Sequence, residues 1–359
     1  MFSDMFIGLR NLRRRRLRTA LTAVMIIVST NLVVFAKGLN EGTYADMIEL
    51  ATATWTGHIQ IQGEGYNDNP SLFKNVADGA SLRDAIATRD DIESVTTRVD
   101  SAGLLAAGNR TAGAILTGVE PVGESRTTTL PNAITEGSWL PPAEPTSGDG
   151  DESDYDDEAD LPVLPIVLGE GLAKRLKVKV GDEISFMGQA ADGSIAAELF
   201  TVTGLLDSGL DELDASLALI RISDAQELFE LGTRVHRVVV LLKDLETLEQ
   251  SAAALRADTT NQVLSWKEML PELASSIEAD RAGGHIFIIV IVLVVLLGVS
   301  NSMAMSVLER TREFGVMMAI GTSPKRIVAL TIWEAFWLSG LGVAIGTAMG
   351  VLTIHALKD

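Results

Sequence analysis

Three long apolar runs dominate the 359-residue sequence and constrain its fold more than any other feature. They occupy residues 19–36, 285–308 and 328–353. A helix needs roughly 20 apolar residues to cross the hydrocarbon core of a bilayer, and each run approaches or exceeds that length. We therefore predict an α-helical membrane protein with three visible spans. A large domain, residues 37–284, is inserted between the first span and the second.

Charged residues are distributed unevenly around these runs, which predicts the orientation of the chain. The sequence has 29 Lys and Arg against 48 Asp and Glu, a net charge of −19. Residues 1–18 nevertheless contain six arginines and one acid, and residues 309–327 contain four basic residues and two acids. Basic segments beside spans stay in the cytoplasm. We therefore expect a cytoplasmic N-terminus, an extracytoplasmic domain at 37–284 and an outer-face tail at 354–359, with no nucleic-acid binding.

The N-terminal segment predicts a membrane anchor. Residues 1–18 alternate apolar side chains with arginine at helical spacing, which indicates an amphipathic helix at the cytoplasmic surface. A cleavable signal peptide is the alternative for the run at 19–36, because Val34, Phe35 and Ala36 loosely resemble a cleavage site. The run is longer than the roughly 7 to 15 apolar residues of such signals, which favours the anchor.

The inserted segment 37–284 is predicted to be an α+β domain in two lobes, because β-branched runs alternate with helical patterns. The predicted strands are 58–62, 114–119, 163–169, 183–186, 199–206, 215–220 and 238–242. The predicted helices are 81–89, 170–178, 223–231 and 244–258. Residues 266–281 are predicted as the helix that returns the chain to the bilayer, with Gly283 and Gly284 as a joint.

Residues 141–160 are rich in proline and then in acidic residues, reading PPAEPTSGDGDESDYDDEAD. Such a segment lacks the apolar residues that offset the cost of ordering a chain, so we predict a disordered loop. A calcium site is the alternative, because Asp149, Asp151 and Ser153 are spaced like the start of an EF-hand loop. Asp154 stands where that loop needs glycine, which favours a loop without metal.

The segment between the second and third runs, 309–327, reads ERTREFGVMMAIGTSPKRI. It has charged ends, an apolar centre and a break at Gly321 and Pro324, and its apolar part is too short to span a bilayer. We predict a short helix that lies along the membrane surface and presents side chains to another protein. The residues that carry this docking prediction are Glu309, Arg310, Glu313, Phe314, Gly315, Met318, Ala319 and Gly321.

This segment resembles the FtsX/MacB/LolC-LolE class of ABC-transporter permeases. The likeness rests on Glu309, Arg310, Glu313, Gly315, Ala319, Gly321 and, in the third run, Glu334. The sequence LGEGLAKRLKVKVGDEISF at 168–186 resembles the LolC/LolE members of this class more closely than the macrolide exporters. The resemblance implies that 309–327 is the coupling helix that docks onto a cytoplasmic ATPase. It also implies that one lobe of the outer domain is inserted within the other, so that the first and last strands of the outer lobe pair.

Members of that class have four spans, whereas three are visible here. Either the sequence is truncated or the fourth helix is missing from this protein. We keep both possibilities open as expectations.

The third run, 328–353, contains small residues on one face and one acid. Gly342, Gly346 and Gly350 recur at intervals of four, so they share a helix face that allows close approach of another membrane helix. Glu334 lies about two turns inside the run. A membrane acid is costly unless it is paired or near the headgroups, so Glu334 should reach the cytoplasmic surface or bond a partner helix. Its role in anchoring or in gating stays open.

Motifs for catalysis and metal binding are absent from the sequence. It has no G-x-x-x-x-G-K-[ST] phosphate loop, no cysteine, and four histidines without the spacing of a metal site. We therefore predict a transport subunit that is not an enzyme and binds no cofactor or metal of its own. ATP and Mg²⁺ are expected on the partner ATPase.

The resemblance implies a permease subunit in the bacterial inner membrane that pairs with a second permease subunit, in a homo- or heterodimer, and with a cytoplasmic ABC ATPase dimer. ATP hydrolysis there would move the periplasmic domain through the second span, which is mechanotransmission. The LolC/LolE-like features imply release of lipoproteins from the membrane lipid to a periplasmic carrier. The alternatives are MacB-like export of a peptide or drug, FtsX-like regulation of a periplasmic cell-wall hydrolase without transport, and a membrane-anchored binding module without an ATPase.

Overall fold

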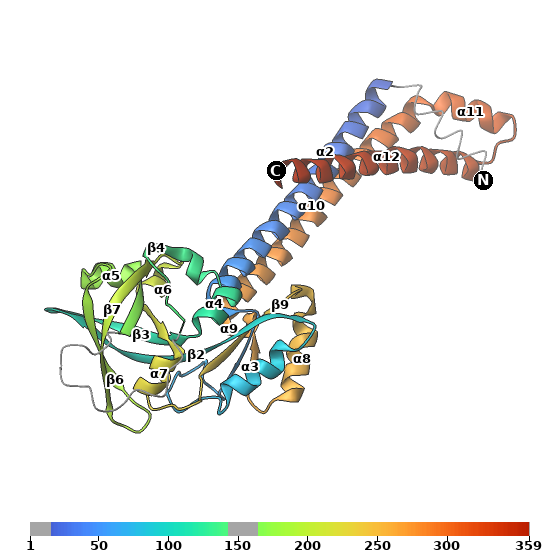
Figure 1. Ribbon diagram of the computed structural model, residues 1–359. Coiled ribbons are helices and arrows are strands. Elements are labelled where there is room, and N and C mark those ends of the chain that lie inside the picture. The colour runs from blue at the N-terminus through green and yellow to red at the C-terminus, as the bar shows by residue number, and fades with distance from the viewer. Residues whose placement is uncertain (1–15, 143–163, 359) are drawn as a thin grey trace, which may run out of the picture. The chain divides into compact units, whose positions relative to one another are not determined.

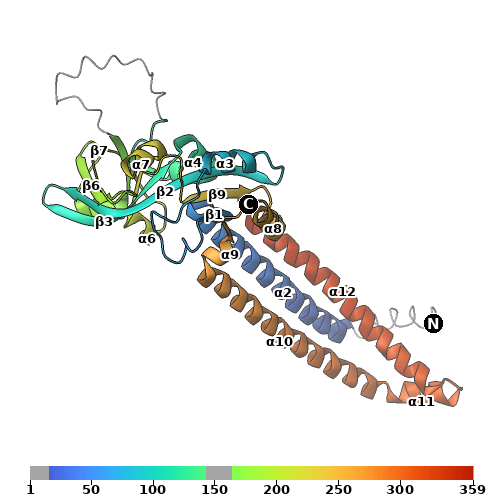
Figure 2. The same cartoon turned by 90° about the horizontal axis from the view of Figure 1, so that it is seen from below.

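The computed structural model describes residues 16–142 and 164–358 of the chain (Figures 1 and 2). Most of the predicted interfacial helix 1–18 and of the acidic loop 141–160 lies outside these residues. The candidate calcium ligands Asp149, Asp151 and Ser153 lie outside them as well. The chain divides into two compact units, one made of Met1–Met47 with Glu272–Asp359 and the other of Ile48–Pro271.

The first unit is built on three helices that are long and apolar enough to cross a membrane. They are α2 (Arg16–Ala51), α10 (Pro271–Glu309) and α12 (Pro324–Lys358). The mean hydropathy of their most apolar windows is 2.1, 2.8 and 1.7. Large apolar side chains such as Val28, Leu297 and Leu352 are more than half exposed, as suits helices whose solvent is lipid. The structure thus contains the three apolar helices that the sequence predicts.

Small side chains let α2 approach α10 closely. The hydroxyls of Thr22 in α2 and Ser302 in α10 are hydrogen-bonded at 2.8 Å. A Cβ atom on Gly298 of α10 would lie 2.5 Å from Met25 Cε, so that position has room only for glycine unless the Met25 side chain shifts. Without a hydrophobic driving force in lipid, such close packing and interhelical hydrogen bonds hold spans together.

The glycine face of α12 packs against α2 of the same chain. A Cβ atom on Gly346 would lie 2.7 Å from the Ile27 carbonyl oxygen and 2.7 Å from Thr30 Cβ. A Cβ atom on Gly342 would lie 2.7 Å from a side chain of α2, and a Cβ atom on Gly350 would lie 2.8 Å from another. This face is therefore occupied by a helix of its own chain.

Helix α10 runs without a break through Gly283 and Gly284, where the sequence predicted a joint. That prediction is wrong, and contacts with α2 supply the reason. Arg281 Nη2 donates to Glu41 Oε2 at 2.9 Å, and its guanidinium carbon lies 5.5 Å from the centroid of the Tyr44 ring. Each glycine destabilises a helix by about 1 kcal/mol relative to alanine, and the ion pair and the cation–π contact, each worth up to about 1 kcal/mol at exposed sites, offset part of that cost.

Replacing Gly346 tests the packing of α12 on α2. We expect Gly346→Leu to lower the thermal unfolding midpoint of the full chain in mild detergent, because the new side chain meets the α2 backbone. Gly340→Leu is the matched control, since a Cβ atom there has no neighbour within 4 Å. Equal midpoints for the two variants would show that the glycine face does not pack as described.

The second unit, Ile48–Pro271, is an α+β domain, and its described residues contain ten strands that form one hydrogen-bonded sheet. The strands are β1 (Ile59–Gln62), β2 (Ile92–Ala107), β3 (Arg110–Val119), β4 (Ile134–Gly137), β5 (Leu164–Gly169), β6 (Glu183–Gln189), β7 (Ile195–Leu206), β8 (Leu217–Arg221), β9 (Arg237–Leu242) and β10 (Gln262–Ser265). Their order is β10-β1-β9-β2-β3-β8-β5-β7-β4, and β6 pairs with β2 and β7. The first and last strands pair antiparallel, with Ile59 opposite Ser265, as the resemblance implied.

Short helices cover the sheet. They are α3 (Gly79–Ala87), α4 (Pro121–Thr127), α5 (Glu170–Leu176), α6 (Asp211–Asp214), α7 (Ile222–Leu228), α8 (Leu248–Asp258) and α9 (Trp266–Met269). A π-helix, η1 (Thr52–Thr56), follows α2, and short 3₁₀ turns lie at η2 (Leu130–Ala133) and η3 (Leu245–Thr247). Helices α3 and α4 pack on β2, α7 packs on β3 and α8 packs on β10 (Figure 1).

Strand β2 joins the two ends of this sheet. Its residues Ile92–Arg98 pair with β9, and its residues Leu104–Ala106 pair with β6. Strand β3 lies antiparallel to its second half, from Arg98 onward. Buried apolar side chains occur at both ends, such as Ile59 and Val239 near one end and, near the other, the cluster Val119, Leu130, Leu140, Val167, Leu206, Leu217 and Leu219. The domain therefore depends on what β2 buries.

Candidate functional site

The segment between α10 and α12 contains one short helix, α11 (Thr311–Ala319). Gly321 ends it with a φ of +96°, a left-handed conformation that favours glycine. The N–H groups of Gly321 and Thr322 donate to the carbonyls of Met318 and Met317, both at 3.0 Å, which closes the end of the helix. Pro324 then opens α12 at the position where proline is tolerated.

Most residues predicted for docking on this segment are exposed. Exposed are Glu309, Glu313, Gly315, Met318, Ala319 and Gly321, whereas Phe314 is buried and Arg310 is mostly buried. The apolar side chains of Val316, Met318 and Ile320 are 60%, 47% and 78% exposed. An exposed apolar surface on a short helix with charged ends is typical of a protein-binding surface.

Arg310 joins α11 to α12. Its Nη1 donates to Glu334 Oε2 at 3.1 Å and its Nε donates to Glu313 Oε2 at 3.3 Å. Its guanidinium carbon lies 5.1 Å from the centroid of the Phe314 ring. The side chains of Arg310 and Glu334 are only 15% and 12% exposed. Glu334 therefore has its partner within the chain, and the structure brings together three residues of the resemblance, Arg310, Glu313 and Glu334.

The pairing of Arg310 with Glu334 was not named from the sequence, which offered the membrane surface or a partner helix for Glu334. The sequence does contain a pattern that indicates this pair. A basic residue follows the second apolar run and an acid lies early in the third, so the short connection between the runs can bring the two side chains to the same depth along the helices. No group of three or more His, Cys, Asp or Glu side chains that could hold a metal occurs in the described part of the chain.

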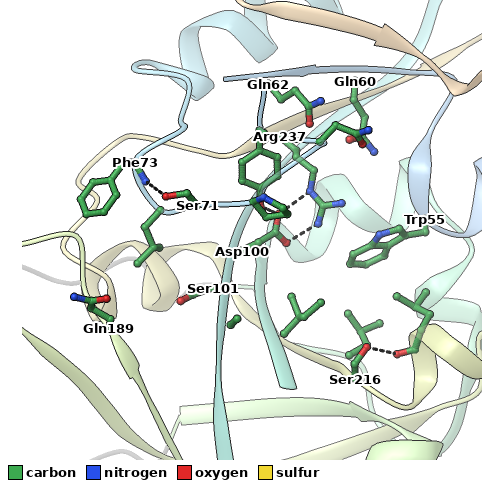
Figure 3. A pocket seen from close by; sticks show the side chains of 18 residues that line it. Trp55, Gln60, Gln62, Ser71, Phe73, Asp100, Ser101, Gln189, Ser216 and Arg237 are labelled. Atoms are coloured by element: carbon green, nitrogen blue, oxygen red, sulfur yellow. Dashed lines mark hydrogen bonds and ion pairs between the residues drawn. The ribbon is translucent and has the colours of Figure 1, made fainter. Parts of the chain in front are cut away.

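In the second unit, two guanidinium–carboxylate pairs lie buried around Trp55, and Figure 3 shows the one formed by Asp100 and Arg237. Arg98 pairs with Glu124, both side chains are fully buried, and Arg98 Nη1 also donates to the Trp55 carbonyl at 2.7 Å. Arg237 donates from Nε and Nη2 to the two oxygens of Asp100, at 2.7 and 2.5 Å. The two guanidinium carbons lie 4.0 and 4.9 Å from the centroid of the Trp55 ring, within cation–π range.

Asp100 is fully occupied by donors. Besides Arg237, Tyr66 Oη donates to it at 2.9 Å and Thr117 Oγ1 donates to it at 2.8 Å. Burial alone raises the pKa of Asp100, but the Arg237 guanidinium and these hydrogen bonds outweigh burial and hold the pKa at about 2. Burial and the Asp100 charge together raise the pKa of Tyr66. The group is therefore a fixed anion bonded to a neutral phenol.

Comparison with known proteins identifies the class. Residues 19–258 match the MacB-like periplasmic core domain, and residues 285–358 match the FtsX-like permease C-terminal region. Since the first match covers more than half of the chain, the chain belongs to the MacB/LolC/FtsX family of ABC-transporter permeases. The family predicted from the 309–327 segment is thereby confirmed.

Two relatives show the range of that family. The lipoprotein-releasing system transmembrane protein LolC of Neisseria meningitidis serogroup B is 26% identical over 195 residues, 52% of this chain and 47% of the relative. The macrolide export ATP-binding/permease protein MacB of Nitrobacter winogradskyi is 25% identical over 353 residues, 93% of this chain and 50% of the relative. The chain thus spans about half the length of the curated relatives it matches.

Among solved structures, the periplasmic region of MacB from Actinobacillus actinomycetemcomitans matches with a TM-score of 0.39 and 18% identity, over 61% of this chain and 91% of that one. Relatives named LolC and MacB match at similar identity. Family membership alone therefore does not select between lipoprotein release and macrolide export.

Removing Glu124 tests the buried pair. We expect Glu124→Ala to reduce the free energy of unfolding by about 3–5 kcal/mol, because Arg98 is left as an uncompensated buried charge. Glu249→Ala is the control, since its pair with Lys267 is exposed and such pairs contribute about 1 kcal/mol or less. Urea unfolding of the full chain in detergent measures both. A loss in Glu124→Ala no larger than in Glu249→Ala would contradict the described burial.

His58 makes the stability of the domain depend on pH. Burial lowers its pKa from 6.5 to about 4, and its Nδ1 accepts from the Leu242 N–H at 3.0 Å. A group whose folded pKa is depressed stabilises the fold above its unfolded pKa, and that stability is lost as pH falls through the folded value. We expect the thermal unfolding midpoint of the full chain to decrease as the pH is lowered from 6.5 to 4. His58→Gln should make this decrease with pH smaller. His285→Gln, at an exposed position, should leave the decrease unchanged.

Proposed function

We propose that the chain is the permease subunit of a mechanotransmission-type ABC transporter in the bacterial inner membrane, with α11 as its coupling helix. The observation that carries this proposal is a short helix with an exposed apolar surface, in which Arg310 at its start bonds Glu313 of the same helix and Glu334 of α12. A partner ABC ATPase dimer binds ATP and Mg²⁺, and a second permease subunit completes the pair. The basic residues around α11 support a cytoplasmic position for this segment and for the N-terminus.

A docked ATPase can exert force on both helices that flank α11. The Arg310–Glu334 pair links the start of α11 to α12, so a displacement of α11 acts on α12 directly. Helix α10 is unbroken over 39 residues, a length of about 58 Å at 1.5 Å per residue. An unbroken helix of that length transmits movement better than the jointed helix expected from the two glycines. These features support mechanical coupling to the domain at Ile48–Pro271.

We propose release of lipoproteins from the inner membrane as the transport activity, with membrane lipid and a periplasmic carrier as further partners. The LolC-like phrase at 168–186 and the relative named as part of a lipoprotein-releasing system support this choice. Macrolide export is the second candidate, because the alignment with a relative named for that activity covers 93% of this chain.

Two substitutions on α11 test the coupling proposal. Gly315→Pro breaks the helix, since an interior proline costs about 3 kcal/mol, and Met318→Glu places a charge on its apolar surface. We expect each to reduce the ABC ATPase that co-purifies with the full chain at least about tenfold, while membrane insertion stays unchanged. Met187→Glu is the control, at a position of similar exposure on β6. Undiminished ATPase in both α11 variants would exclude α11 as the coupling helix.

The bound substrate of the purified complex separates the two transport candidates. Mass spectrometry that finds acylated peptides supports lipoprotein release, and a bound macrolide-class molecule supports export. A stoichiometric cell-wall hydrolase without either ligand would replace transport by regulation of that hydrolase.

A further inference from the structure

A cavity of about 550 Å³ opens within the second unit, Ile48–Pro271, beside the Asp100–Arg237 pair (Figure 3). Sites for small molecules commonly measure about 300 to 1,000 Å³, so this volume suits a ligand of that class. The lining comes from strands β1, β2, β3, β6, β8 and β9, from η1 and α6, and from the loop that follows β1. Segments far apart in the sequence therefore build it.

Much of the lining is apolar. It includes Leu72, Phe73, Ala102, Ile115, Leu213 and Leu217. Phe73 is 70% exposed and Ile115 is 44% exposed, so part of this apolar surface meets solvent. Large exposed apolar side chains beside a cavity are typical of ligand-binding grooves. The cavity thus offers apolar surface that a ligand would remove from water.

The cavity offers no free charge among the described residues. Its charged lining residues are Asp100 and Arg237, which neutralise each other through two hydrogen bonds. Tyr66 and Thr117 occupy the remaining acceptor capacity of Asp100. A charged ligand would lose its hydration here without gaining an opposite charge, which disfavours it. The lining therefore selects an uncharged ligand.

Two glutamines of β1 line the cavity, and only one has a partner for its amide nitrogen. Gln60 and Gln62 lie on the same face of β1, because side chains two apart in a strand point the same way (Figure 3). Gln60 Nε2 donates to the Thr56 carbonyl at 2.7 Å. Gln62 is 1% exposed, and its Nε2 has no hydrogen-bond partner among the described residues. A buried donor left unpaired costs free energy that an acceptor on a ligand would recover.

We propose that this cavity binds a neutral amphipathic molecule whose carbonyl oxygen accepts a hydrogen bond from Gln62 Nε2, while its apolar groups lie against Ile115 and Leu217. The carbonyl belongs either to the amide of an apolar peptide or to the ester of an acyl lipid, which share this chemistry. The proposal concerns the Ile48–Pro271 unit and depends neither on an ATPase partner nor on transport.

Calorimetric titration of the full chain in lipid nanodiscs tests the proposal, with empty nanodiscs as the blank. The probes are N-acetyl-leucyl-leucinamide for the peptide amide, 1-octanoylglycerol for the acyl ester, and N-acetyl-leucyl-leucine as a charged counterpart. We expect saturable binding of at least one neutral probe, and the one that binds identifies the source of the carbonyl. The charged probe should bind at least about tenfold more weakly. Binding of neither neutral probe, or tighter binding of the charged one, overturns the proposal.

Variants then locate the site. Gln62→Leu should weaken binding of the neutral probe by about three- to tenfold, the effect of one hydrogen bond, without lowering the unfolding midpoint. Gln60→Leu is the matched control for stability, because it loses the bond to Thr56 and should lower the midpoint.

Ile115→Trp fills part of the cavity and should weaken binding more than about tenfold. Ile195→Trp changes an exposed β7 position outside the lining and should bind normally. Equal affinity in all four variants overturns the proposal. So does a Gln62→Leu variant that is as destabilised as Gln60→Leu.

Discussion

The outer domain depends on the neutralisation of two charges that strand β2 buries. Arg98 and Asp100 lie two residues apart on β2, which joins both ends of the sheet, and neither could be buried there alone without a cost of several kcal/mol. Glu124 of α4 and Arg237 of β9 supply the opposite charges, and the Trp55 ring lies against both guanidinium groups. The same pairs anchor η1 and α4 to the sheet and leave the adjoining cavity without a free charge.

In the first unit, which contains α2, α10 and α12, small residues and one ion pair hold the helices together. Glycines on α12 and Gly298 on α10 let both helices approach α2, where lipid offers no hydrophobic drive for association. Arg310 offsets the cost of placing Glu334 within α12 and fixes the start of α11. The exposed apolar surface of α11 therefore begins at a residue that is ion-paired to α12.

Much of this architecture was predictable because its signals are local. The apolar runs predicted the three helices. The β-branched runs, such as 199–206, predicted seven of the ten strands found in the described residues, although some strands are longer than predicted. Strand β2 was missed, because its polar sequence VTTRVDS does not read as buried, and its burial depends on partners about 25 and 140 residues away. Gly283 and Gly284 predicted a joint, but helix α10 is continuous there and Arg281 contacts α2 beside them. The 309–327 motif predicts docking residues, and their role stays a prediction. The Arg310–Glu334 pair, the ion pairs around Trp55 and the unpaired amide of Gln62 depend on three-dimensional packing that no local pattern shows.

The proposed role of α11, as the surface on which an ATPase acts, can be tested by crosslinking. A photo-crosslinking amino acid is placed at Met318 of the full chain in native membranes, and the attached protein is identified by mass spectrometry. We expect an ABC ATPase to be attached at this position and to be absent when the crosslinker replaces Met187 on β6. A crosslink only to lipid, or to a protein from the opposite side of the membrane, would show that α11 is not the ATPase-docking helix.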